Sequence, residues 1–255
     1  MKNRTLLISF AALLLATQLL LVFPQCVISG FPMRVNHSPV IGQGRVNGDE
    51  VRFTGNINLI DHDTPYATQV EPTIAVLSDG TICAGWKEAQ THSGGGYRVG
   101  FSYSTDNGHT WSENILMQTL NPGDRQSDPW LVADQDDNLY FVHLDWNDGT
   151  GASSIGVSKS VDGGATWLPI VSASDTGLGF DDKETACVDP DGNLYIVWDW
   201  YADAGPTELT FTKSTDGGAT FQPATAIANP FIPYITSAHN GTLFITTTEW
   251  PGLSG

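Results

Sequence analysis

The sequence predicts an all-β fold, a β-propeller built from four-stranded blades. Three similar stretches, "STDNGHTW", "SVDGGATW" and "STDGGATF", begin at Ser104, Ser160 and Ser214, 56 and 54 residues apart. A fixed period of this length is typical of arrays of supersecondary units, and units of four short strands are typical of propeller blades. After residue 30 we find no sustained helical period. The 27 glycines and 14 prolines fit a turn-rich β-protein.

Residues 1–30 are predicted to be a signal peptide or an N-terminal membrane anchor. Lys2 and Arg4 precede an apolar run from Leu6 to Phe23. That run is long for a signal peptide, so cleaved and uncleaved forms both stay open. In either case we expect a secreted or cell-surface protein that meets the membrane only through this segment, with residues 31–50 as a linker.

The net charge limits the classes of possible partner, and the cysteines indicate whether a disulfide is expected. The net charge is −17, and it becomes −19 without residues 1–30, which argues against binding to nucleic acid or anionic lipid. Cys83 and Cys187 lie in apolar strand-like runs. We therefore expect buried free thiols rather than a disulfide.

Each unit is predicted to run strand A, tight turn, strand B, loop, strand C, the repeated turn, strand D. In the A–B hairpins an apolar run leads through an Asp, Gly or Asn turn into a second run rich in β-branched and aromatic residues. These hairpins lie at 71–86, 128–144, 184–198 and 235–250, and the C strands read "YRVGFSYS", "SSIGVSKS" and "ELTFTKS".

Residues 51–255 thus hold three blades and the first hairpin of a fourth. We interpret residues 51–69 as the last strand and exit loop of a missing blade, so the ring is expected to be incomplete. The alternative is that half rings assemble with one another, because a half ring exposes apolar blade faces.

The repeated turn is predicted to build structure rather than to carry chemistry. Ser and Asp side chains can bond backbone N–H groups across a turn, Gly takes the left-handed conformation, and the closing aromatic packs beside the blade. The residues with this role are Ser104, Asp106, Gly108, Trp111, Ser160, Asp162, Gly164, Trp167, Ser214, Asp216, Gly218 and Phe221.

The pattern Ser-x-Asp-x-Gly-x-Thr-Trp resembles the Asp-box, or BNR, repeat of the sialidase-like β-propellers over about residues 60–255. The resemblance implies six or more blades, with the Asp-boxes on the face opposite the functional face. Enzymes of that family use three arginines, an aspartate acid and a tyrosine–glutamate nucleophile pair. The family's Phe/Tyr-Arg-Ile-Pro motif does not occur in this sequence, so its catalytic residues are not transferred.

The D–A loops, on the face opposite the repeated turns, supply the candidate catalytic groups. Asp63, Asp128, Asp182 and Glu184 are the candidate acid and base, because glycosidases work with paired carboxyl groups. Arg125 and Lys183 are candidates for binding an anionic group. The alternative is a plain ring of ion pairs around the axis.

The B–C loops on the same face add candidate sugar-binding residues. Trp146, Trp200 and Tyr201 are expected to stack on sugar rings, and Asp145 and Asp199 to bond hydroxyl groups. The Asp-Trp pair recurs at the end of strand B, with Glu249-Trp250 in the fourth unit. That periodicity also fits a structural role.

No metal or cofactor is expected. "DQDDN" at 134–138 and "DPDGN" at 189–193 resemble the start of a calcium loop, but both fall at an A–B turn, which favours the turn interpretation. The sequence therefore predicts an exported propeller that recognises, and as an exo-glycosidase hydrolyses, a glycan or glycoprotein. The alternatives are a non-catalytic carbohydrate- or protein-binding module and a purely structural propeller.

Overall fold

The computed structural model describes residues 42–46, 49–53, 59, 66–91, 96–174, 179–202, 207–228 and 231–248. Over these residues the chain forms only strands, turns and loops, and no helix is long and apolar enough to cross a membrane. In the described residues three antiparallel sheets have four strands each, and two further sheets have two strands each. The predicted all-β fold of four-stranded blades is confirmed. Residues 1–30 lie outside the described residues.

The blades follow the predicted strand order. The first contains β3 (Thr68–Val76), β4 (Ile82–Ala89), β5 (Arg98–Ser104) and β6 (Ile115–Leu116). The second contains β7 (Arg125–Ala133), β8 (Leu139–Trp146), β9 (Ser153–Ser160) and β10 (Val171–Ser172). The third contains β11 (Phe180–Val188), β12 (Leu194–Tyr201), β13 (Thr207–Ser214) and β14 (Thr225–Ala228). The half blade contains β15 (Phe231–Ser237) and β16 (Leu243–Thr248).

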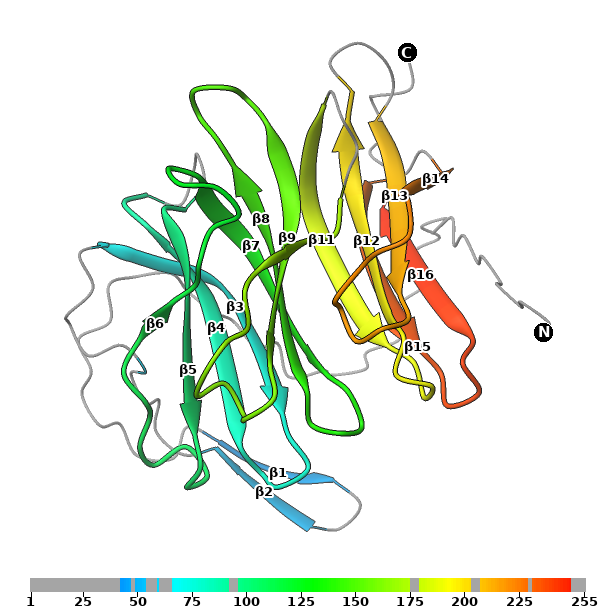
Figure 1. Ribbon diagram of the computed structural model, residues 1–255. Helices are drawn as coiled ribbons and strands as arrows, with labels where there is room; N and C mark the ends of the chain where they lie inside the picture. The colour runs from blue at the N-terminus through cyan, green and yellow to red at the C-terminus, as the bar shows by residue number, and fades with distance from the viewer. Residues whose placement is uncertain are drawn as a thin grey trace, which may run out of the picture.

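Successive blades lie side by side, from β3–β6 through to β15–β16 (Figure 1). The innermost strand of each blade packs against the innermost strand of the next, β3 on β7, β7 on β11 and β11 on β15. These four strands therefore line the axis of the partial ring. The outermost strands β6 and β10 are only two residues long, so the D strands are shorter than the sequence suggests.

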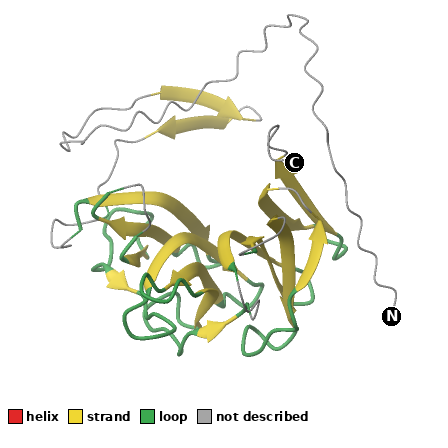
Figure 2. Ribbon diagram, turned by 90° about the horizontal axis from the view of Figure 1, so that it is seen from above, coloured by secondary structure: helices red, strands yellow, loops and turns green. Residues whose placement is uncertain are grey.

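A separate hairpin precedes the blades. β1 (Gly42–Val46) pairs with β2 (Asp49–Phe53), and Figure 2 shows this pair apart from the other sheets. In the structure β2 therefore pairs with β1 and not with a strand of the blades, and the expectation that residues 51–53 are the last strand of a missing blade stays a prediction. The sequence between the two strands is Asn47-Gly48, a dipeptide that strongly favours a two-residue hairpin turn.

The apolar core lies between the blades. Trp167 closes the repeated turn of the second blade and packs edge-on against Phe101 of the first, with ring centroids 4.9 Å apart. Phe221 likewise packs against the core shared by the second and third blades. Cys83 and Cys187 are buried and free, as expected, and burial raises the pKa of each thiol to about 12.

The three repeated turns use the same hydrogen bonds. In the second turn Ser160 Oγ donates to Asp162 Oδ1 (2.8 Å) and accepts from Gly164 N (2.8 Å), while Thr166 N donates to Asp162 Oδ1 (2.8 Å). The first and third turns repeat this set through Asp106 and Asp216. Bonds from Thr110 and Thr220 hold the pKa values of these two aspartates at about 2.

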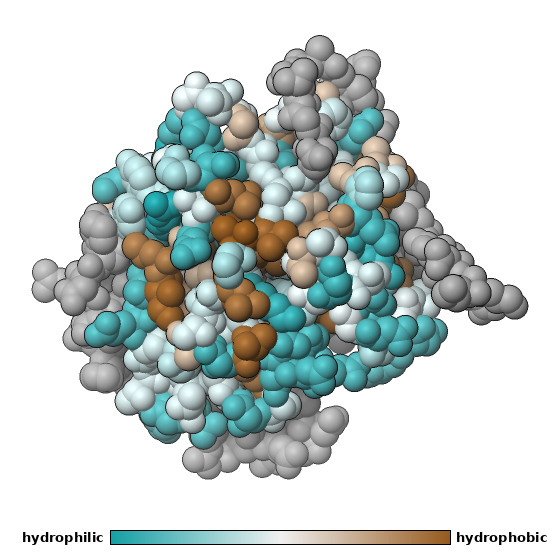
Figure 3. All heavy atoms as spheres, viewed as in Figure 1, coloured by the Kyte–Doolittle hydropathy of each residue, from teal (hydrophilic) through white to brown (hydrophobic). Residues whose placement is uncertain are grey.

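The surface seen in the view of Figure 1 is largely hydrophilic, with apolar side chains gathered near its middle (Figure 3).

Candidate functional site

Every innermost strand has a β-bulge at the same position. The pairing register slips between Val70 and Thr73, Ser127 and Trp130, Asp182 and Thr185, and Phe231 and Tyr234. One residue in each bulge has a positive φ: Glu71 (54°), Asp128 (50°), Lys183 (55°) and Ile232 (52°). This conformation is uncommon for residues other than glycine, and bulges of this kind gather beside functional sites.

The residue after each positive φ explains the bulge and sets the third blade apart. Proline has no N–H for the ladder, so inside a sheet it is confined to edges and bulges. Pro72, Pro129 and Pro233 occupy this position in three strands, whereas Glu184 occupies it in β11. Only in the third blade, among the described strands, does this position carry an ionisable side chain.

Ion pairs join the bulges of three blades. Lys183 Nζ pairs with Asp128 Oδ1 and lies 4.0 Å from Glu71 Oε1. Lys87, only 3% exposed, places its Nζ 2.7 Å from the same oxygen. Asp128 N donates to Glu71 Oε2 (3.2 Å). Glu71 and Lys87 were missed by sequence reasoning, although the in-phase prolines marked the bulges.

Three further carboxyl groups belong to β11 and β12. Glu184 is 2% exposed, and neither of its side-chain oxygens has a hydrogen-bond partner among the described residues. Burial, followed by the negative charge of Asp128, raises its pKa well above the ordinary value. Asp182 and Asp199 are directly opposite each other across the strand pair. Burial is also the main cause that raises their pKa values to about 6.

The charges of these groups act on one another, so we treat them as one site, the axial cluster. Asp199 is fully buried, and its Oδ2 accepts a bond from Ile232 N (2.9 Å), while Oδ1 has no partner in the described part of the chain. The axial cluster comprises Glu71, Lys87, Asp128, Asp182, Lys183, Glu184 and Asp199.

A groove of about 500 Å³ continues from the bulges along the innermost strands. Its lining begins at Pro72 and includes Trp130, Ala186 and Tyr234. Trp130 is fixed there because its Nε1 donates to Ala186 O (2.9 Å). The groove thus follows the bulges along the axis, and its lining residues are different from those of the axial cluster.

Arg125 is at the same end of the blades but is already held. Its guanidinium lies 4.8 Å from the ring centre of Tyr97 and 5.1 Å from that of Trp146. Nη1 donates to Asp148 Oδ2 (2.5 Å), and Nε donates to Gly96 O (3.1 Å). These contacts stabilise the positive charge of Arg125 within the protein.

The aromatic groups at this end are distributed differently from the sequence-based expectation. Trp146 is only 9% exposed and lies against Arg125, and Trp200 packs on the core between the second and third blades. Tyr201 lies near Asp199, whose charge, after burial, raises the tyrosine pKa to about 12. The accessible ring is Tyr97, 40% exposed and stacked on Tyr66 at 5.1 Å, which sequence reasoning did not select.

The repeated Asp-Trp pair is not a structural repeat. In the second blade Asp145 is paired with Gln126. In the third blade the residue equivalent to Gln126 is paired with Trp200, and Asp199 is paired with Asp182. The two aspartates are therefore one residue out of register, and a shift of one residue places side chains on opposite faces of a sheet. Asp145 is 1% exposed inside the second blade, 2.8 Å from His143 Nδ1.

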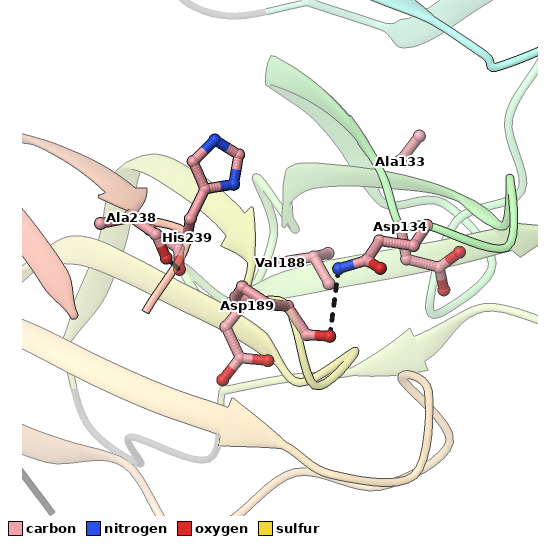
Figure 4. Close-up of a pocket in the computed structure, with 9 residues that line it drawn as sticks. Ala133, Asp134, Val188, Asp189, Ala238 and His239 are labelled. Atoms are coloured by element: carbon pink, nitrogen blue, oxygen red, sulfur yellow. Dashed lines mark hydrogen bonds between the residues drawn. The ribbon is translucent and has the colours of Figure 1, made fainter. Parts of the chain in front are cut away.

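At the opposite end of the axis the A–B turns form a pocket of about 290 Å³ (Figure 4). Asp134 and Asp189 border it, and each accepts bonds from the backbone and side chain of the asparagine four residues later. Gln135 Nε2 donates to Pro190 O across the pocket (3.1 Å). In the part of the chain that the structure describes, no group of three potential metal-ligating side chains is found. Asp63, Glu249 and Trp250 lie outside the described residues.

Residues 47–245 match the family model described as a BNR repeat-like domain. The chain belongs to the BNR repeat-like family. The sialidase-like β-propeller family that the sequence resembles is thereby confirmed. Comparison with curated protein sequences gives no match.

Solved structures share the fold at low sequence identity. The Hadza microbial sialidase is 14% identical, with a TM-score of 0.60, over 75% of this chain and 44% of that one. The Fusarium graminearum α-L-arabinofuranosidase with an iminosugar inhibitor is 15% identical, with a TM-score of 0.56, over 78% of this chain and 64% of that one. The leech intramolecular trans-sialidase is 13% identical, with a TM-score of 0.54, over 75% and 49%. This chain thus spans about half the length of these sialidases.

Proposed function

We propose that this protein is an exported glycan-binding propeller that hydrolyses glycosidic bonds at the axial cluster. The observation that carries the proposal is Glu184, a buried carboxyl group without a hydrogen-bond partner among the described residues, beside Asp128 and Asp182. Carboxyl groups whose pKa values are pushed apart by their surroundings are typical of acid–base pairs. The sialidases and the arabinofuranosidase with the same fold act on glycans, which supports the substrate class.

The residues have separate roles in this proposal. Glu184, whose pKa is raised well above its ordinary value by burial, gives its proton to the oxygen of the leaving sugar. Asp182, whose pKa of about 6 leaves it ionised at pH 7, takes a proton from the water whose oxygen attacks the anomeric carbon. Asp128, paired with Lys183, stabilises the positive charge that develops on the sugar ring. Export rests on the charged start and apolar run of residues 1–23.

The test is a screen of the full chain for turnover of aryl glycosides, followed by the variant Glu184→Gln. We expect the variant to bind the glycan that is found and to lose at least ~100-fold in kcat, because the amide cannot donate the proton in the same way. The control is Asp136→Asn, an exposed side chain at an A–B turn on the opposite end. Turnover by Glu184→Gln at the wild-type rate would overturn the assignment.

A non-catalytic glycan-binding module is the second candidate. The Tyr66–Tyr97 stack favours it, because a partly exposed aromatic ring can bind a sugar without chemistry. The same variant distinguishes the two functions. If the protein is a binding module, the wild type and Glu184→Gln bind the glycan with equal affinity, and neither protein hydrolyses it.

A further inference from the structure

Among the described residues, the lysines and arginines at the axial end are all engaged within the protein. Arg98 Nη1 donates to Asp124 O (3.2 Å), and Arg125 is bonded to Asp148 and Gly96 O between two aromatic rings. Lys87 is buried against Glu71. Lys183, with its side chain 42% exposed, is the most accessible cation, and it is paired with Asp128.

The carboxyl groups of the axial cluster, in contrast, do not all have a partner within the described residues. The axial cluster holds five of them and two lysines. Glu184 is 2% exposed with both oxygens unpartnered, and Asp199 is fully buried with Oδ1 unpartnered, among the described residues. Both belong to the group of interacting charges at the bulges. These free oxygens are suited to hydroxyl groups, which can donate to a carboxylate and accept from a protonated carboxyl group.

A ligand carboxylate would meet the opposite situation. It would have to displace Asp128 from Lys183 or enter beside the carboxylates of Asp182 and Asp199, where no described residue offers a free cation to receive it. Like charges at short range repel strongly where water is partly excluded. A hydroxyl or hydroxymethyl group at the same place carries no such penalty.

We infer that the axial cluster takes an uncharged glycan and rejects sugars that carry a carboxylate, such as sialic acids and uronic acids. This inference rests on the proposed function and names its substrate class. It distinguishes this chain from the sialidases with the same fold, which are named for a carboxylate sugar.

The test uses pairs of sugars that differ in one group. Binding by the full chain is measured by calorimetry for aryl glucoside against glucuronide, aryl galactoside against galacturonide, an aryl arabinofuranoside, and sialyllactose against lactose. We expect at least one uncharged member to bind at least ~10-fold more tightly than its carboxylate counterpart, and added salt to narrow the difference. The variants Asp182→Asn and Asp199→Asn should also reduce this difference in affinity. Asp136→Asn is the control that should leave the difference unchanged.

The outcomes are distinguishable. Tighter binding of the carboxylate sugars overturns this inference and leaves the proposed function standing. Failure of every glycan to bind overturns the proposed function and the inference with it. Because an axial substitution can also disturb folding, each variant is checked by thermal melting, and the salt dependence of the wild-type preference provides a second measurement that needs no variant.

Discussion

The two ends of each blade follow opposite rules. At the repeated turns, the same side chains make the same bonds in three blades, from Ser104, Ser160 and Ser214. At the bulges, the same backbone conformation recurs in four strands, but the residues change from glutamate to aspartate, lysine and isoleucine. A repeat that retains its side chains maintains structure. A repeat that retains only its backbone leaves the side chains available to form a site.

The largest effect is expected from breaking the turn end. In Gly164→Ala the new Cβ would lie 2.3 Å from Phe101 Cζ, and φ at this position is +92°. We expect a loss of about 3–5 kcal/mol in the free energy of unfolding, from overpacking and backbone strain together. The measurement is denaturant unfolding.

Gly192→Ala is the matched control for that prediction. Its φ is +77°, but no atom lies within 4 Å of the new Cβ, so only strain of about 1–2 kcal/mol remains. Equal losses for the two variants would show that the contact with the neighbouring blade is unimportant.

The next prediction is that the carboxyl groups at the two ends of the blades make stability depend on pH in opposite directions. The pKa values of Asp106 and Asp216 are lowered to about 2, so their contribution to stability is complete above the unfolded value near 4 and is lost as the pH falls toward 2. The pKa values of Asp182 and Asp199 are raised to about 6, so the folded state binds more protons than the unfolded chain between these values. Stability should therefore rise as the pH falls from 7 to 5.

We expect this rise to be on the order of 1 kcal/mol after allowance for the solvent that reaches these side chains. Unfolding measured at pH 7, 5 and 3 checks it. The double variant Asp182→Asn with Asp199→Asn should flatten the change between pH 7 and 5 and leave the loss below pH 4. A wild-type protein less stable at pH 5 than at pH 7 would contradict the assignment of the raised pKa values.

The smallest effect on stability is expected from relieving the backbone strain at the bulges. Ile232 has φ 52° and is 49% exposed, so its side chain gains little from packing while its backbone is strained. Ile232→Gly is expected to raise the free energy of unfolding by about 0.5–1 kcal/mol. Lys183→Gly relieves the same strain but removes the ion pair with Asp128, so it should weaken glycan binding. A clear loss of stability in Ile232→Gly would mean that this bulge is not strained.

The blades could be predicted from the sequence because their signals are local. A serine, an aspartate and a glycine within five residues determine each repeated turn, and alternating apolar residues determine the strands beside it. The C strand expected from "SSIGVSKS" coincides with β9. The short outer strands could not be predicted, because their length depends on pairing and not on their own sequence.

The site was predictable in part. Asp128, Asp182, Lys183 and Glu184 were selected, and the structure brings them together, because they begin the innermost strands of neighbouring blades. Glu71 and Lys87 were missed, and Arg125 was assigned to a ligand although loops of two blades provide its aromatic and acidic partners. The different surroundings of Asp145 and Asp199 could not be predicted, since a one-residue offset between blades is invisible without the strand register.

The bulge also affects how such a site can be altered. Each innermost strand presents its axial residues as one short consecutive stretch, 70–72, 127–129 or 182–184, to which the next strands add Lys87 and Asp199. Exchanging these tripeptides among blades rewrites the charge pattern around the axis without rebuilding a hydrophobic layer. Under the proposed function, these three-residue segments would carry much of the ligand preference, and a library of them would test whether new segments give new specificities.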